Sequence, residues 1–197
     1  VLDALVELKQ DTAAPPLDSK PIPFDQTQGR PVAPTLDSVL AEIGSLPREA
    51  LFLGVASDGL PVLLNLHDPI PGPLLIVGDA GTGKTAFSQM LVQGVQQTHP
   101  AENVQFGVIT SHPEEWKHVA TTPHRVGIFP VTHGSAQDFI QSLASWAHAN
   151  NKAGQSILLL IDDLESVAKL EPDTLQNLRW LLLRGPEQDT AWAHGVV

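Results

Sequence analysis

The sequence predicts an α/β three-layer sandwich with a mostly parallel sheet, preceded by a β-hairpin and a proline-rich linker. Two observations carry this prediction. Short apolar runs alternate with helical patterns along most of the chain, which is typical of strands buried between two layers of helices. A glycine-rich segment also stands between one such run and a helix, where a parallel sheet binds ligands. The 197 residues are enough for one sizeable core.

Residues 1–35 are predicted to be a helix fragment followed by a linker. Leucines recur at helical spacing within Val1–Gln10, which indicates the end of a helix. Six prolines follow before Thr35, and this density removes the backbone donors that helices and central strands need. The linker is either a passive tether or an arm that lies on a neighbouring subunit.

Residues 36–197 are predicted to form the folded domain. A short helix over 36–43 precedes a hairpin, whose runs 51–56 and 61–66 flank an Asp-Gly turn signal. Strands and helices then alternate, with strands expected at 74–77, 104–110, 126–131 and 157–161, and helices at 84–97, 114–119, 135–149 and 174–184. A last apolar run, 193–197, ends where a further strand is expected to be starting, so we expect the domain to be incomplete at its C-terminus.

Composition excludes several classes of function. The net charge is -11, so the average surface repels phosphate backbones, and this segment alone is not expected to bind nucleic acid non-specifically. With no cysteine, thiol catalysis, disulfides and Cys-ligated zinc are impossible, and a cytoplasmic location is favoured. No apolar run approaches the roughly 20 residues of a membrane span, so no membrane contact is expected.

The glycine-rich segment fits the phosphate-loop pattern G-x-x-x-x-G-K-[ST] at every fixed position. Its residues are Gly78, Asp79, Ala80, Gly81, Thr82, Gly83, Lys84 and Thr85. Glycines let the backbone turn its N–H groups toward phosphate oxygens, and the helix that follows adds its positive dipole end. Lys84 is predicted to reach the β- and γ-phosphates, and the Thr85 hydroxyl to be a ligand of Mg²⁺. The sequence therefore predicts nucleotide binding with Mg²⁺.

Two carboxylates follow the apolar strand 157–161, at the edge where a parallel sheet opens. Asp162 is predicted to hold Mg²⁺ through a water molecule, and Asp163 to orient or deprotonate the attacking water. Glu165 is a lesser candidate for that second role, being better placed in the first turn of a helix. The alternative is that these acids are ordinary strand-end or helix-capping residues.

The sequence also indicates which division of the P-loop NTPases the chain fits and which nucleotide it binds. Two predicted strands lie between the phosphate loop and Asp162, which favours the additional-strand division of the P-loop NTPases. No Asn-Lys-x-Asp motif of the kind that reads guanine occurs, so ATP is favoured over GTP.

From Leu51 onward the chain resembles the FtsK/HerA-type motor ATPases. The resemblance lies in the hairpin at 53–66, the strand and loop at 73–85, the strand at 104–110 and the acidic strand end at 158–165. It implies an ATPase that self-associates into a ring and moves DNA or protein through its pore, with ATP and Mg²⁺ as cofactors.

The chain departs from this family at two places. It has Asp162-Asp163 where the family usually has Asp-Glu, and Ser111-His112-Pro113 where Asp-Pro-Lys is common. A glutamate is longer by one methylene, so Asp163 would hold water farther from the γ-phosphate. Two hypotheses follow: a hydrolysing motor domain, or a nucleotide-dependent switch or assembly module with little or no hydrolysis.

The four tryptophans, Trp116, Trp146, Trp180 and Trp192, are predicted to pack in the core or an interface. None is surrounded by Lys or Arg, as a stacking platform for nucleic-acid bases would be.

Overall fold

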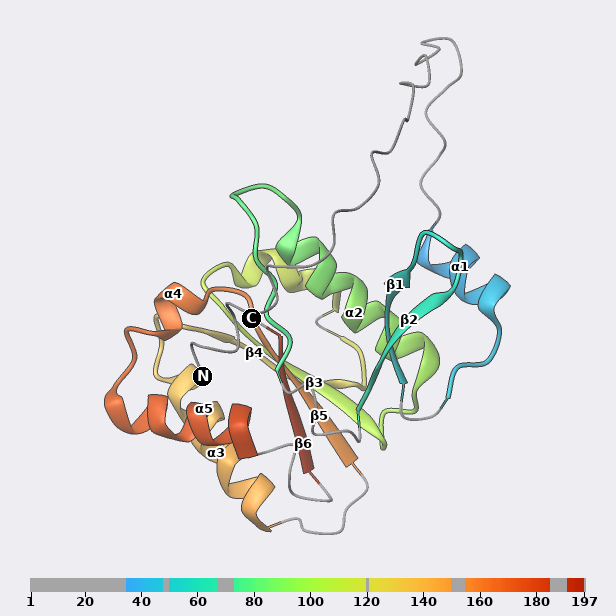
Figure 1. Cartoon of the computed structure of the whole chain (residues 1–197). Helices are drawn as coiled ribbons and strands as arrows, with labels where there is room; N and C mark the ends of the chain where they lie inside the picture. The colour runs from blue at the N-terminus through green and yellow to red at the C-terminus, as the bar shows by residue number, and fades with distance from the viewer. Residues whose placement is uncertain are drawn as a thin grey trace, which may run out of the picture. The chain divides into compact units, whose positions relative to one another are not determined.

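A parallel four-stranded sheet forms the centre of the computed structural model, which describes residues 35–47, 50–66, 73–119, 121–149, 155–184 and 191–196 (Figure 1). The strand order is β4-β3-β5-β6, and each neighbouring pair runs parallel. The strands are β3 (Val104–Thr110), β4 (Arg125–Pro130), β5 (Gln155–Ile161) and β6 (Ala191–Val196). The mixed α/β fold with a mostly parallel sheet is confirmed. The helix predicted over Val1–Gln10 and the linker after it lie outside the described residues.

Helices cover both faces of the sheet. Helix α2 lies on one face, and α3 and α5 lie on the other (Figure 1). The α-helices are α1 (Leu36–Ile43), α2 (Lys84–Thr98), α3 (Ser135–Ala149), α4 (Leu164–Val167) and α5 (Pro172–Arg184). A further helical segment, η3 (Pro113–Val119), lies between β3 and β4 in the chain. The segment predicted as a helix at 114–119 is a 3₁₀ helix, η3. No helix within the described ranges has the length and apolar character that crossing a membrane requires.

Alternation along β5 divides the core into two parts. Side chains of a strand point alternately to opposite faces. Ile157, Leu159 and Ile161 accordingly pack with α3 and α5, whereas Leu158 and Leu160 pack with α2. All five are buried, which explains why the strand reads as an unbroken apolar run. The three-layer arrangement predicted from that run is confirmed.

The predicted hairpin is present as an antiparallel pair, β1 (Ala50–Val55) and β2 (Pro61–Asn65). Its turn forms as the Asp-Gly signal indicates: the Asp58 carboxylate accepts a hydrogen bond from the Leu60 backbone N–H at 3.0 Å, and Gly59 has a φ of 86°. Leu51 is buried in the cluster that also contains residues of α2, so the hairpin extends the α2 layer.

Two strand predictions need correction. Over 74–77 only Leu74 makes an isolated bridge, and Val77 is 83% exposed. An apolar run becomes a strand only where another strand offers its hydrogen-bonding edge, and residues 75–77 pair with no strand among those described. At the other end, residues 193–196 of the last apolar run belong to a strand that has already begun, since β6 begins at Ala191 and pairs in parallel with β5.

Candidate nucleotide-binding site

The loop before α2 has the backbone that the motif predicts. Gly81 and Gly83 have φ values of 76° and 93°, a region that side-chain-bearing residues rarely adopt. A Cβ at Gly78 would lie 2.6 Å from the Thr82 Oγ1. That hydroxyl donates to the Asp79 backbone carbonyl at 2.9 Å and closes the loop. Backbone conformation at Gly81 and Gly83 and the close approach of Thr82 at Gly78 therefore favour glycine at these three positions, and the loop forms an open cradle.

The N-terminus of α2 opens into this cradle. Gly83 is the N-cap residue, and no side chain caps the first turn. The first backbone N–H groups of a helix have no partners within the helix, and they favour anions. A cavity of about 400 Å³ lies against this turn. Its lining residues are Gly81, Gly83, Lys84, Thr85, Ala86, Gln89 and Glu115.

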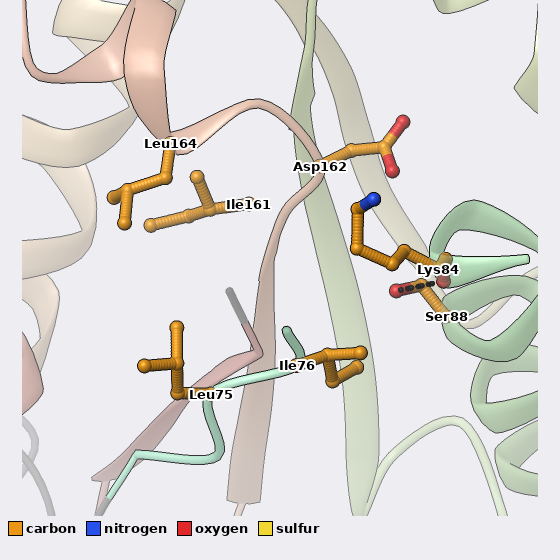
Figure 2. Close-up of a pocket in the computed structure, with 7 residues that line it drawn as sticks. All are labelled: Leu75, Ile76, Lys84, Ser88, Ile161, Asp162 and Leu164. Atoms are coloured by element: carbon orange, nitrogen blue, oxygen red, sulfur yellow. Dashed lines mark hydrogen bonds between the residues drawn. The ribbon is translucent and has the colours of Figure 1, made fainter. Parts of the chain in front are cut away.

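Lys84 folds back over the loop. Its Nζ donates to the backbone carbonyls of Gly78 at 2.8 Å and Asp79 at 2.9 Å. An ammonium group has three hydrogens to donate, so these two bonds leave one for a phosphate oxygen. Lys84 also lines a smaller cavity, of about 130 Å³, together with Asp162 (Figure 2). The opposite wall of that cavity is apolar and includes Leu75 and Ile161.

Thr85 and Asp162 meet although 77 positions separate them in the chain. The Thr85 hydroxyl donates to Asp162 Oδ1 at 2.8 Å. Asp162 directly follows β5, and its backbone N–H donates to the Ile109 carbonyl of β3 at 2.9 Å. A carboxylate and a hydroxyl beside a phosphate cradle are hard oxygen ligands of the kind Mg²⁺ prefers. The residues present therefore fit this metal ion, with Thr85 and Asp162 as the groups that would hold it.

Two donors that the sequence analysis missed also contact Asp162. Thr110, the last residue of β3, donates its hydroxyl to Asp162 Oδ2 at 3.1 Å, and the Trp116 indole Nε1–H donates to the same oxygen at 3.3 Å. Thr110 could have been found, because it ends the strand next to β5 at the same sheet edge. Trp116 was predicted only to pack; it does pack, being fully buried, and no pattern in the sequence indicated its hydrogen bond.

Asp163 is the N-cap of α4. Its carboxylate accepts from the Ser166 backbone N–H at 2.9 Å, from the Ser166 hydroxyl at 2.6 Å and from the Ser111 hydroxyl at 2.5 Å. Partial burial raises the pKa of Asp163, but these hydrogen bonds outweigh burial and hold the pKa below its usual value. A carboxylate with a lowered pKa and three donors is a weak proton acceptor. The contacts of Asp163 therefore match the alternative in which it is a helix-capping residue.

Glu165 lies in the first turn of α4, as the sequence predicted. Its side chain is 86% exposed and pairs with Lys169 at 3.0 Å, one helical turn away.

Comparisons with known proteins bear on the fold. No protein-family model and no curated protein matches the chain. Among solved structures, Thermomonospora curvata EccC (ATPases 2 and 3) in complex with a signal sequence peptide superposes with a TM-score of 0.62 at 18% identity, covering 79% of this chain. The cytoplasmic domain of the Thermomonospora curvata type VII secretion ATPase EccC gives a TM-score of 0.64 at 19% identity over 79% of this chain. The fold is that of a P-loop ATPase domain.

A third similar structure is the pCW3 conjugation coupling protein TcpA with ATPγS, with a TM-score of 0.54 at 10% identity over 79% of this chain. These proteins are FtsK/SpoIIIE-family ATPases, so the resemblance noted in the sequence is confirmed for the fold. The chain spans only 30%, 20% and 49% of the lengths of the three structures.

Proposed function

We propose that this P-loop domain binds ATP with Mg²⁺ at residues 78–85 and hydrolyses it as part of an oligomeric motor. The observation that carries the proposal is the meeting of three side chains from two distant segments: Lys84 over the loop, and Thr85 bonded to Asp162 at 2.8 Å. A glycine turn that merely connects a strand to a helix needs no such carboxylate. The TcpA structure with ATPγS supports a nucleotide as ligand of this fold.

The chain's own residues would divide the work as follows. The loop N–H groups and Lys84 bind and orient the phosphates. Thr85 and Asp162 hold Mg²⁺, which, when bound, would neutralise charge on the β- and γ-phosphate oxygens. If the domain hydrolyses ATP, Asp163 orients the attacking water molecule. For this role, its carboxylate must give up hydrogen bonds to Ser111 or Ser166.

The net charge of this chain bears on which polymer such a motor would move. The net charge of -11 opposes contacts between this chain and nucleic acid. The EccC structures come from a secretion ATPase, one of them with a signal sequence peptide, whereas TcpA is a conjugation coupling protein. We favour a polypeptide over DNA as the polymer that this chain contacts, in a self-associated ring. The absence of cysteine supports a cytoplasmic location.

A second candidate is a nucleotide-dependent switch or assembly module with little or no hydrolysis. The contacts of Asp163 favour it, because a carboxylate that caps α4 and has a lowered pKa is poorly suited to accept a proton from water. Binding of ATP would then select one conformation without turnover.

Thermal unfolding with and without ATP and Mg²⁺ tests the binding site. A ligand that binds only the folded state at a hundredfold excess over its Kd adds about 2.7 kcal/mol, which corresponds to a Tm rise of roughly 5–10 °C for a chain of this size. Lys84→Ala should remove most of this rise, and Lys117→Ala, on exposed η3 surface, should retain it. A wild-type Tm unmoved by millimolar ATP and Mg²⁺ would reject the proposal.

Phosphate release then separates the two candidate functions. We expect the hydrolysing motor to release phosphate in the wild type and not in Lys84→Ala. A wild type that gains Tm with ATP yet releases no phosphate above the Lys84→Ala background supports the switch.

A further inference from the structure

The Asp162 carboxylate is held by three donors from three elements. Thr85 of α2 bonds Oδ1, whereas Thr110 at the end of β3 and Trp116 of η3 both bond Oδ2. The two oxygens therefore have different surroundings. Oδ1 faces the phosphate loop, and Oδ2 faces the protein interior, where Trp116 is fully buried.

Trp116 is firmly placed. Its ring belongs to the core cluster that includes Leu91 and Val92 of α2 and Phe106 of β3. The backbone beside it is also fixed, because the Gln89 side chain of α2 donates to the Glu115 carbonyl at 3.0 Å. An indole has a single polar hydrogen, on Nε1, and a ring packed on all sides cannot turn it elsewhere. The direction of this donor is thus set by the core.

We propose that Trp116 is a positioning residue for the magnesium site, on the premise that the chain binds Mg-ATP as proposed above. A carboxylate rotates readily about its last torsion, and a metal ligand must keep one oxygen turned toward the ion. By bonding Oδ2 from the core side, Trp116 and Thr110 keep Oδ1 on the side of Thr85. Trp116 acts through Asp162 and touches neither nucleotide nor metal.

A purely structural role for Trp116 predicts a different result from a positioning role. If the ring only fills space, phenylalanine replaces it with a modest loss of stability and no effect specific to Mg²⁺. If the N–H orients Asp162, Trp116→Phe weakens the part of ATP binding that depends on Mg²⁺ and leaves binding without Mg²⁺ unchanged. The contrast between the two conditions is a readout that a structural role does not move.

The test is calorimetric titration of ATP into wild type, Trp116→Phe and Trp180→Phe, each with Mg²⁺ and with EDTA. Trp180 is the matched control: it is a partly buried tryptophan of α5, stacked on the His148 ring at 3.8 Å and packed in the cluster on the other sheet face. We expect Trp116→Phe to weaken binding about tenfold with Mg²⁺, the usual effect of losing one hydrogen bond to a charged group, and to leave binding in EDTA as in wild type. Trp180→Phe should match wild type in both conditions.

Each other outcome overturns the inference. Trp116→Phe that binds Mg-ATP as tightly as wild type, or that loses the same factor with and without Mg²⁺, means that the ring only packs. Wild type that binds no ATP in either condition rejects the nucleotide site itself, whereas wild type that binds ATP equally with Mg²⁺ and EDTA rejects only the inference.

A measurement on wild type covers the case in which Trp116→Phe does not fold. In ¹⁵N-labelled protein saturated with ATP, adding Mg²⁺ should shift the Trp116 indole N–H signal more than the other indole signals, because its acceptor, Asp162, becomes a metal ligand. An unmoved Trp116 signal under these conditions refutes the inference.

Discussion

Replacement of Asp163 distinguishes a helix cap from a catalytic base, because the two roles need different atoms. As a cap, Asp163 uses carboxylate oxygens to accept from the Ser166 N–H at 2.9 Å and from the hydroxyls of Ser166 and Ser111. Asparagine retains one such oxygen and is as good an N-cap as aspartate, whereas alanine retains none. As a base, Asp163 needs a charge that asparagine lacks.

The magnitude follows from these contacts. Losing an N-cap side chain costs about 1 kcal/mol, within a range of roughly 0.5–2 kcal/mol. Ser111 also loses an acceptor, so we place Asp163→Ala near the upper end of that range. For a chain of this size each kcal/mol lowers Tm by about 2–4 °C. Asp163→Asn should keep most of the stability.

The assay is denaturant unfolding of wild type, Asp163→Ala and Asp163→Asn at several pH values. The pKa of Asp163 is lower in the folded state than its usual value, so its ionised form stabilises the fold fully above about pH 4 and less as pH falls through the lowered pKa. The deficit of Asp163→Ala should therefore be full at pH 7 and shrink below pH 4. Equal stability of all three proteins at pH 7, or equal losses in both variants, would refute the capping argument.

The same variants address hydrolysis. If Asp163 is also the base, Asp163→Asn should lower kcat roughly 10²–10⁴-fold while keeping stability and ATP affinity. Asp163→Glu restores the residue typical of the resembling family, yet glutamate is a poor N-cap, so we expect it to lower Tm as Asp163→Ala does. Turnover that is unchanged in Asp163→Asn would assign the residue to capping alone.

Three further outcomes are expected. Thr85→Ala should weaken ATP binding with Mg²⁺ and leave binding in EDTA near wild type, as read by titration, because we propose that its hydroxyl holds the metal ion. Gly107→Ala should destabilise by about 1–3 kcal/mol in denaturant unfolding, since its Cβ would run into the Phe139 ring from α3. Its matched control, Gly94→Ala within α2, meets no atom within 4 Å and should stabilise by up to about 1 kcal/mol, because glycine is a poor helix former.

Local patterns predicted most of the architecture. The phosphate loop is readable because its conformation depends on its own glycines, such as Gly81 and Gly83 at positive φ. The strand at 104–110 and the helices at 36–43 and 135–149 have the predicted bounds, because their apolar periodicity reports the faces that they bury. The hairpin likewise follows from a two-residue turn signal.

The predictions that were wrong concern segments whose structure depends on pairing with a strand far away in the sequence. Residues 74–77 read as a strand, but pairing is a property of two segments, and Val77 remains 83% exposed. At the C-terminal end a strand was expected to be only starting in the run from residue 193, whereas β6 begins at Ala191 and forms a parallel ladder with β5. Whether a ladder forms, and at which residue it begins, depends on the partner strand and is not visible in the local sequence.

The two adjacent acids show how neighbours assign chemistry. Asp162 and Asp163 directly follow the same strand and have the same side chain, and the sequence predicts a metal role for the first and a water-activating role for the second. Asp162 faces a hydroxyl of the phosphate loop and a buried indole N–H, and one of its oxygens remains turned to the loop. Asp163 faces the serines that begin α4 and follow β3, and its charge is used in capping. Alternation along a strand end sends consecutive side chains to different sides. One carboxylate therefore suits a metal ion and the other a helix N-terminus, and the proposed role of Asp163 in hydrolysis requires its carboxylate to leave the cap.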